Sequence, residues 1–125
     1  MTDLAHLQDL VEGQDRGAEL VVKHPVTGEL TDIVLTIAGP DSDVQRRARL
    51  MMQDEMMAFR GRPPAGEYER MDLDRLARCV VAWRGMDAPF SFSAVVKLLK
   101  DVPFVREQAE EFSKSRVDYF LRLTP

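Results

Sequence analysis

Cysteine is almost absent from this 125-residue chain, and Cys79 is the only one. A single cysteine excludes an internal disulfide, and no Cys or His residues occur at metal-ligand spacing, so we expect no metal site. The two histidines, His6 and His24, are expected to be ordinary surface residues. Because nothing nearby in the sequence would lower the pKa of Cys79, we expect a buried structural thiol.

Long apolar runs are also missing. No segment approaches the roughly 20 apolar residues that span a bilayer, and the first residues include Asp3 rather than a basic, then apolar, signal segment. The net charge of -4 argues against binding of nucleic acid or anionic lipid over the whole surface. The sequence therefore predicts a cytoplasmic protein with neither a membrane nor a nucleic acid as its partner.

Catalytic motifs are lacking as well. The segment 61–66 contains glycines, but Pro63 and Pro64 remove backbone N–H groups that would hold a phosphate. No nucleophile elbow is present, and the neighbouring Glu110 and Glu111 are expected on a solvated helix face. We expect no enzymatic activity and no cofactor.

The composition, with 45% hydrophobic and 30% charged residues, is typical of a globular protein. The length fits a single domain over residues 1–125. We divide it into an N-terminal helix and link (1–18), a β-hairpin (19–38) and a helical part (41–121). The predicted fold class is α+β and mostly α-helical, with one N-terminal β-hairpin packed on about four to five helices.

The hairpin is predicted from two segments rich in β-branched residues, 19–24 and 30–37, each with alternating apolar positions. Pro25 and Gly28 lie between them and favour a turn in which Gly28 takes a positive φ. A two-stranded ribbon alone is marginally stable in water, so it must pack on the helices.

Apolar spacing and capping residues predict five helices. They cover residues 3–11, a segment from the caps at 41–43 to about 60, about 69–83, 91–100, and 103 to about 121. Residues 61–66 are expected to form a loop, and Pro103 is suited to a first helical turn.

The second of these helices is apolar on more than one face, and it contains a methionine-rich segment, 51–57. Leu50 and Met57 project to the side opposite the main apolar stripe, and methionine is common on surfaces that accommodate variable apolar partners. Core packing explains about half of these residues; the others indicate an interface. The candidate partner-binding residues are Leu50, Met51, Met52, Met56, Met57 and Phe59.

Positive charge gathers around the same helix, at Arg46, Arg47, Arg49, Arg60 and Arg62. One interpretation is a nucleic-acid patch, and a small nucleic-acid-binding regulatory protein that uses the Arg46, Arg47 and Arg49 cluster is the alternative function. We favour a solvated face with ion pairs to Asp43, Asp54 and Glu55, because the total charge is acidic.

Several short segments occur in a characteristic order. They are residues 19–28 (ELVVKHPVTG), 39–42 (GPDS), 80–85 (VVAWRG), 89–91 (PFS), 98–99 (LL) and 103–108 (PFVREQ). This order resembles the tail assembly chaperones of long-tailed bacteriophages and prophages, the tape measure chaperone family. The resemblance spans roughly residues 19 to 121. It departs from the family after Trp83, where a longer polar segment containing glycine is common.

The resemblance implies a non-enzymatic role in viral tail assembly. Such chaperones coat the tape measure protein, keep it soluble and help to recruit the tail tube protein, which then displaces them. The family commonly also makes a frameshift-extended form of the chain. It further implies a place in the host bacterial cytoplasm, absence from the mature virion, and weak homo-oligomer formation along the long partner. A nucleic-acid regulator and an enzyme with a pocket of perturbed titratable groups remain the competing classes.

Overall fold

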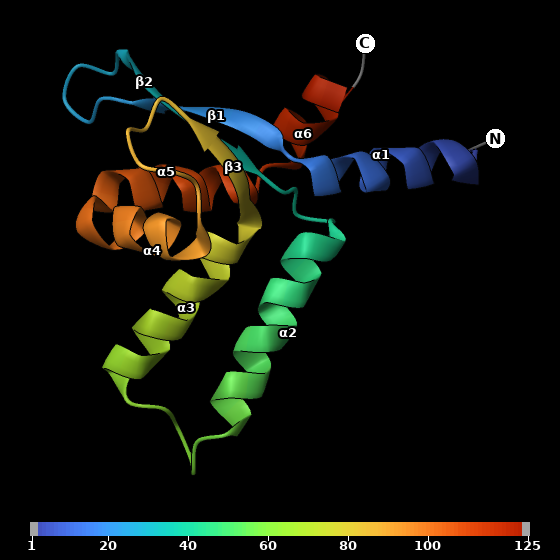
Figure 1. Cartoon of the computed structure of the whole chain (residues 1–125). Helices are drawn as coiled ribbons and strands as arrows, with labels where there is room; N and C mark the ends of the chain where they lie inside the picture. Colours follow the sequence, from blue (N-terminus) through green and yellow to red (C-terminus); the bar gives the residue numbers. More distant parts are fainter. Residues whose placement is uncertain (1–2, 124–125) are drawn as a thin grey trace.

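The computed structural model describes residues 3–123, with side chains described as far as Tyr119. The elements in this range are α1 (Leu4–Arg16), β1 (Ala18–Lys23), β2 (Leu30–Ile37), α2 (Asp43–Met57), α3 (Ala65–Cys79), β3 (Val80–Arg84), α4 (Phe92–Asp101), α5 (Pro103–Ser113) and α6 (Arg116–Leu123) (Figure 1). The predicted α+β class, mostly helical with an N-terminal hairpin, is confirmed. Within the described range, no helix has both the length and the apolar character needed to cross a bilayer.

The predicted hairpin is present as the antiparallel pair β1–β2, in which Leu20 lies opposite Leu35. Its turn is fixed locally. The backbone N–H of Gly28 donates to the carbonyl of His24 at 3.0 Å, and Gly28 has a φ of 73°. The ring nitrogen Nδ1 of His24 accepts hydrogen bonds from the N–H groups of Val26 and Thr27 at 3.2 and 3.3 Å. His24 is therefore a turn-stabilising residue on the surface.

The prediction of a helix over residues 69–83 is wrong at its C-terminal end. Helix α3 stops at Cys79, and Val80–Arg84 forms a third strand that pairs antiparallel with β2. The register shifts within β3, so that Val80 lies opposite Ile37 and Ala82 opposite Thr36. This bulge lets Val80 and Trp83, three positions apart, both pack toward the core. The three-residue spacing of Val80 and Trp83 in this bulged strand is the same as the spacing of apolar residues on one face of a helix, which explains the wrong prediction.

Other helix boundaries in the structure also differ from the predicted ones, some by more than one helical turn. Helix α1 continues beyond residue 11 to Arg16, α2 ends at Met57, and α3 begins at Ala65 within the predicted loop 61–66. The single last helix is two helices, α5 and α6, separated at Lys114 and Ser115. Of the candidate caps at 41–43, Ser42 is the N-cap of α2, and Ser91 is the N-cap of α4: each accepts a hydrogen bond from the N–H group three residues later, at 3.1 Å.

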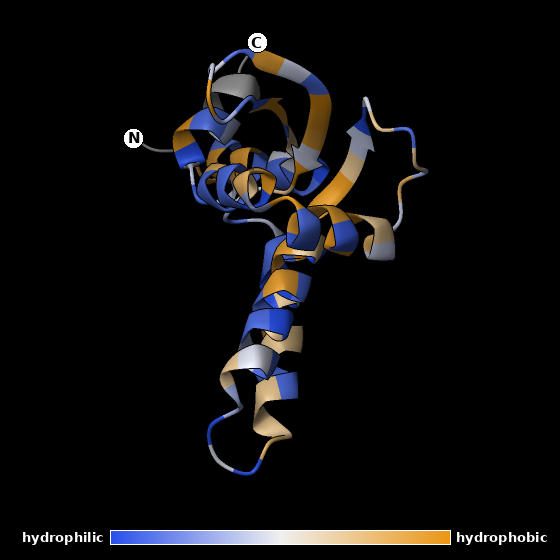
Figure 2. Ribbon diagram, turned by 90° about the vertical axis from the view of Figure 1, so that its left-hand side faces the viewer, coloured by the Kyte–Doolittle hydropathy of each residue, from blue (hydrophilic) through white to orange (hydrophobic). Residues whose placement is uncertain are grey.

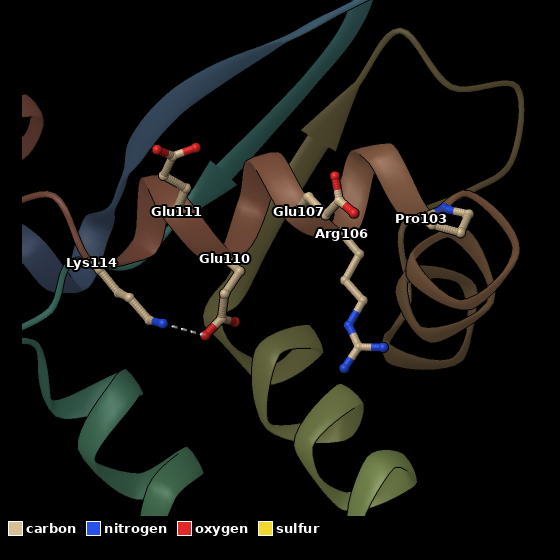
Figure 3. A pocket seen from close by; sticks show the side chains of 6 residues that line it. All are labelled: Pro103, Arg106, Glu107, Glu110, Glu111 and Lys114. Carbon is tan, nitrogen blue, oxygen red and sulfur yellow. Dashed lines mark ion pairs between the residues drawn. The ribbon is translucent and has the colours of Figure 1, made fainter. Parts of the chain in front are cut away.

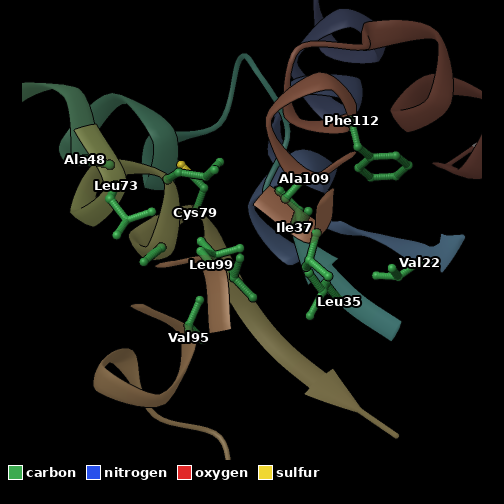
Figure 4. Packing of buried hydrophobic residues seen from close by; sticks show 14 of the residues in the cluster. Val22, Leu35, Ile37, Ala48, Leu73, Cys79, Val95, Leu99, Ala109 and Phe112 are labelled. Atoms are coloured by element: carbon green, nitrogen blue, oxygen red, sulfur yellow. The ribbon is translucent and has the colours of Figure 1, made fainter. Parts of the chain in front are cut away.

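The hydrophobic core lies between one face of the sheet and helices α4 and α5, with the C-terminal half of α3 closing one end (Figure 4). Leu35 and Ile37 from the central strand, Val95 and Leu99 from α4, and Ala109 from α5 are almost completely buried there. Each such valine, leucine or isoleucine side chain stabilises the fold by roughly 1.5–3 kcal/mol relative to exposure in water. The core is complete without α2 beyond its first turns, since only Ala48 of α2 belongs to it.

The loop between β2 and α2 joins several elements. The fully buried Gln14 of α1 accepts a hydrogen bond from the Asp41 N–H at 2.8 Å and donates one to the Asp41 carboxylate at 3.3 Å. Arg116 of α6 donates to both carboxylate oxygens, at 2.8 and 2.7 Å, and this hydrogen bonding lowers the pKa of Asp41. The loop thus fixes α1 and α6 beside the start of α2.

Candidate partner-binding surface

Helices α2 and α3 run antiparallel and extend away from the sheet as a paired projection, which we call the arm (residues 43–79) (Figures 1 and 2). Met52 of α2 and Met71 of α3 are buried. An ion pair between Glu55 and Arg70, at 3.1 Å, crosses between the helices. Since α2 packs chiefly on α3, most of its circumference faces solvent.

The structure divides the predicted partner-binding residues into three groups. Leu50, Met51 and Met57 are exposed, with 44%, 47% and 82% of their surface accessible. Met56 and Phe59 are half-buried. Met52 is buried, with 8% of its surface accessible, so it holds the arm together and is not part of the exposed surface.

One apolar residue of this surface was not predicted. Tyr68, in the first turn of α3, is 48% exposed. It lines an open hollow at the end of the arm together with Met56, Pro63 and Ala65, and Arg62 borders the same hollow. Tyr68 could have been recognised from the sequence only by starting α3 directly after the two prolines, which would place Tyr68 in its first turn.

The arginines of the arm are only partly neutralised. Arg46 and Arg47 both pair with Asp43, as predicted, and the hydrogen bond from Arg46 lowers the pKa of Asp43. Glu55 pairs instead with Arg70 of α3. Within the described residues, Arg49, Arg60 and Arg62 form no ion pair. The arm therefore combines exposed apolar side chains with unpaired positive charge.

A second hollow runs along α5 and is lined by charged residues (Figure 3). Glu110 lies on its wall and binds the half-buried Arg75 through two hydrogen bonds of 2.9 and 3.1 Å. Glu110 also forms an ion pair with Lys114, one helical turn later, at 3.1 Å. Arg75 further donates to Asp72 at 2.9 Å. These charged groups therefore bind one another and link α3 to α5, so their role in this hollow is structural.

Among the described residues, no group of three or more His, Cys, Asp or Glu side chains could hold a metal ion. Cys79 is buried as predicted, and its Sγ donates to the carbonyl of Arg75 at 3.3 Å. Burial raises the pKa of the Cys79 thiol to about 11. The thiolate is the reactive form, so this environment makes Cys79 inert.

We expect the Cys79 thiol to react with an aromatic disulfide reagent at pH 8 roughly 100-fold more slowly in the folded protein than in urea, because a pKa near 11 leaves about one thiolate in a thousand. Absorbance at the wavelength of the released thiol measures both rates. Rapid stoichiometric reaction of the folded protein would show that the thiol is accessible and would contradict this assignment.

Comparisons of the chain with models of protein families, with curated proteins and with solved structures found no match.

Proposed function

We propose that this chain is a tail assembly chaperone of a long-tailed bacteriophage or prophage. It binds and solubilises the tape measure protein through the arm and helps to recruit the tail tube protein during tail assembly. In this proposal the chain is not an enzyme, acts in the host bacterial cytoplasm and is absent from the mature virion. A frameshift-extended form of the same chain belongs to the family pattern and is proposed as a further partner.

The observation that carries the proposal is the exposed apolar surface of the arm. Leu50, Met51, Met57 and Tyr68 are all more than two-fifths exposed, although the core on the sheet is complete without them. Exposed apolar side chains gathered on one projection mark an interaction site rather than a requirement of folding. Three flexible methionines are exposed or half-buried on the arm: Met51, Met56 and Met57. Their side chains can adapt to different apolar side chains along an extended partner.

The partner implied by this chemistry is a helix with an exposed apolar face. A tape measure protein, long and largely helical before the tube encloses it, presents such faces repeatedly. A helix lying along the arm would bury apolar surface on both sides, and each well-placed contact of this kind contributes about 1–2 kcal/mol. Many copies along one client would act together.

The proposal is tested by co-expressing this chain with the tape measure protein of the same phage and measuring the client in the soluble fraction. We expect the unmodified chain to keep the client soluble. Replacing Leu50, Met51 and Met57 together with glutamine should lower the soluble client by tenfold or more, since each loses about 1 kcal/mol of contact.

The matched control replaces exposed apolar residues away from the arm. Val26 and Leu30 in the hairpin are 86% and 66% exposed, and their glutamine variants should solubilise the client normally. A client that stays insoluble with the unmodified chain rejects the proposed function. Normal rescue by the triple variant rejects the arm as its surface.

The unpaired Arg49, Arg60 and Arg62 support the second candidate, a nucleic-acid-binding regulatory protein. That function requires a complex with duplex or single-stranded nucleic acid whose affinity falls steeply with salt. We expect no such complex at about 0.15 M salt. Specific, salt-sensitive binding that is lost when Arg49, Arg60 and Arg62 are replaced with alanine would favour the regulator instead.

A further inference from the structure

The far end of the arm, where a loop joins α2 to α3, carries an apolar hollow of about 420 Å³ that we call the tip hollow (Figure 1). It is lined by Met56 from the last turn of α2, Arg62 and Pro63 from the loop, and Ala65 and Tyr68 from the first turn of α3. None of these residues belongs to the core. A mainly apolar hollow that folding does not use is suited to binding an apolar group.

The backbone around the tip hollow forms it in advance. Consecutive prolines, Pro63 and Pro64, fix their own φ angles, and the Tyr68 N–H donates to the carbonyl of Pro64 at 2.9 Å, so α3 begins directly after the loop. On the other side, the Phe59 N–H donates to the carbonyl of Met56 at 3.2 Å. Met56 and Tyr68 are thus held in place before anything binds, which lowers the entropic cost of binding.

The charge at the tip is positive. Residues 56–66 contain Arg60 and Arg62 and no aspartate or glutamate. Both arginines are exposed, and neither forms an ion pair with any residue that the structure describes. The start of α3 adds to this charge, because no side chain caps its first N–H groups. An anionic group is therefore favoured beside the tip hollow.

The acidic side chains near the tip hollow do not cancel this charge. Those within four positions of Met56 or Tyr68 are Asp54, Glu55, Glu67, Glu69 and Asp72. All except Asp54 are bound by an arginine of α3 or α5, at 2.9 to 3.6 Å. Asp54 lies two positions from Met56, which places it about 160° away around α2, on the opposite side. The surroundings thus leave Arg60 and Arg62 as the unneutralised charges on the side of the tip hollow.

We propose that the tip hollow binds an apolar side chain of the client that is flanked by aspartate or glutamate, and that Arg60 and Arg62 bind the flanking carboxylates. The inference rests on the proposed function and names the segments of the tape measure protein that the arm selects. These are amphipathic helices whose apolar stripe is bordered by acidic residues. An arginine binds a carboxylate through two parallel N–H groups, whereas a helix bordered by lysine or arginine is repelled.

A nucleic acid fits the tip hollow less well. Its affinity comes from many neutralised phosphates, and the tip provides two unpaired arginines. Tyr68 is the one aromatic residue among those that line the hollow, which gives little surface on which bases could stack. An apolar hollow beside two arginines instead matches an apolar side chain beside carboxylates.

The test measures binding of the full chain to fluorescent peptides of about 20 residues that together span the tape measure protein of the same phage. Fluorescence anisotropy gives each affinity. We expect the peptides that bind to be acidic amphipathic helices. In the peptide that binds most tightly, replacing the acidic residues beside its apolar stripe with glutamine should weaken binding roughly fivefold, the effect of two exposed ion pairs. Replacing them with lysine should weaken it further.

Variants of the chain separate the charge from the hollow. Arg60→Gln with Arg62→Gln should weaken the acidic peptide roughly fivefold and leave the glutamine peptide unchanged. Arg60→Glu with Arg62→Glu should reverse the preference, so that the lysine peptide binds more tightly than the acidic one. Tyr68→Ser should weaken both the acidic and the glutamine peptide. The matched control, Arg46→Gln with Arg47→Gln, removes the same charge from the other end of α2 and should keep the preference.

Several outcomes would overturn the inference: no bound peptide, bound peptides without an excess of acidic residues, an unchanged preference in the Arg60→Glu and Arg62→Glu chain, or an equal loss in the control. Tighter binding of a single-stranded oligonucleotide than of any peptide at the same salt would assign the arginines to nucleic acid and overturn it too. The proposed function fails separately, when the unmodified chain does not keep the co-expressed client soluble. A chain that solubilises the client but binds its acidic and basic peptides equally refutes this inference alone.

Discussion

Replacing Gly85 with alanine is expected to lower the free energy of unfolding by at least about 3 kcal/mol. Gly85 follows β3 and has a φ of 79°, a conformation that L-residues rarely adopt. A Cβ atom at this position would lie 1.8 Å from the carbonyl oxygen of Asp32 and 2.6 Å from its carbonyl carbon. Asp32 belongs to the central strand, so relieving the clash would disturb the pairing of Val34 with Arg84.

Urea denaturation followed by circular dichroism measures this loss. Gly28→Ala is the matched control, because Gly28 has a similar φ of 73° but no atom within 4 Å of its would-be Cβ. Its cost should be only about 1 kcal/mol, the conformational penalty alone. Equal losses in the two variants would show that close backbone approach contributes nothing at Gly85.

The parts of the fold that were predicted correctly depend on local signals. The hairpin has alternation in both strands and a proline–glycine turn, and the helix caps Ser42 and Ser91 lie beside the groups that they bind. Strand β3 was missed because its spacing arises from a bulge opposite β2, about 45 residues away in sequence. Long-range pairing of this kind cannot be read from the periodicity of one segment.

The candidate surface, like the fold, was predicted correctly only in part. Leu50 and Met57 lie opposite the apolar stripe of α2, and their exposure was correctly predicted from that geometry. Met51 belongs to the stripe and yet is 47% exposed. The stripe is wide enough for two neighbouring elements, but α2 packs chiefly on α3 alone. The number of neighbours that a helix has depends on the whole fold and not on its own sequence.

Replacing Gln14 with glutamate should lower the free energy of unfolding at pH 7 by about 2–4 kcal/mol. Gln14 is completely buried, and its Nε2 donates to the Asp41 carboxylate at 3.3 Å. Glutamate would place a second carboxylate at about this distance from the first, on a side chain that is itself completely buried. Arg116 already binds both oxygens of Asp41 and cannot fully neutralise another charge. Gln8→Glu, the same change on the exposed side of α1, should cost less than about 0.5 kcal/mol.

The pH dependence separates charge repulsion from a simple packing defect. Burial beside Asp41 would raise the folded-state pKa of the new glutamate, so its penalty applies above the unfolded value of about 4.3 and disappears below it. The folded-state pKa of Asp41 is lowered, so its own stabilisation is present above its ordinary value and is lost as the pH falls through the lowered one. The stability difference between the unmodified chain and Gln14→Glu, measured by urea denaturation, should therefore shrink between pH 7 and pH 4. A difference that stays constant over this range would mean that the carboxylate is not repelled by Asp41 and that the loop tolerates charge through some rearrangement of Gln14.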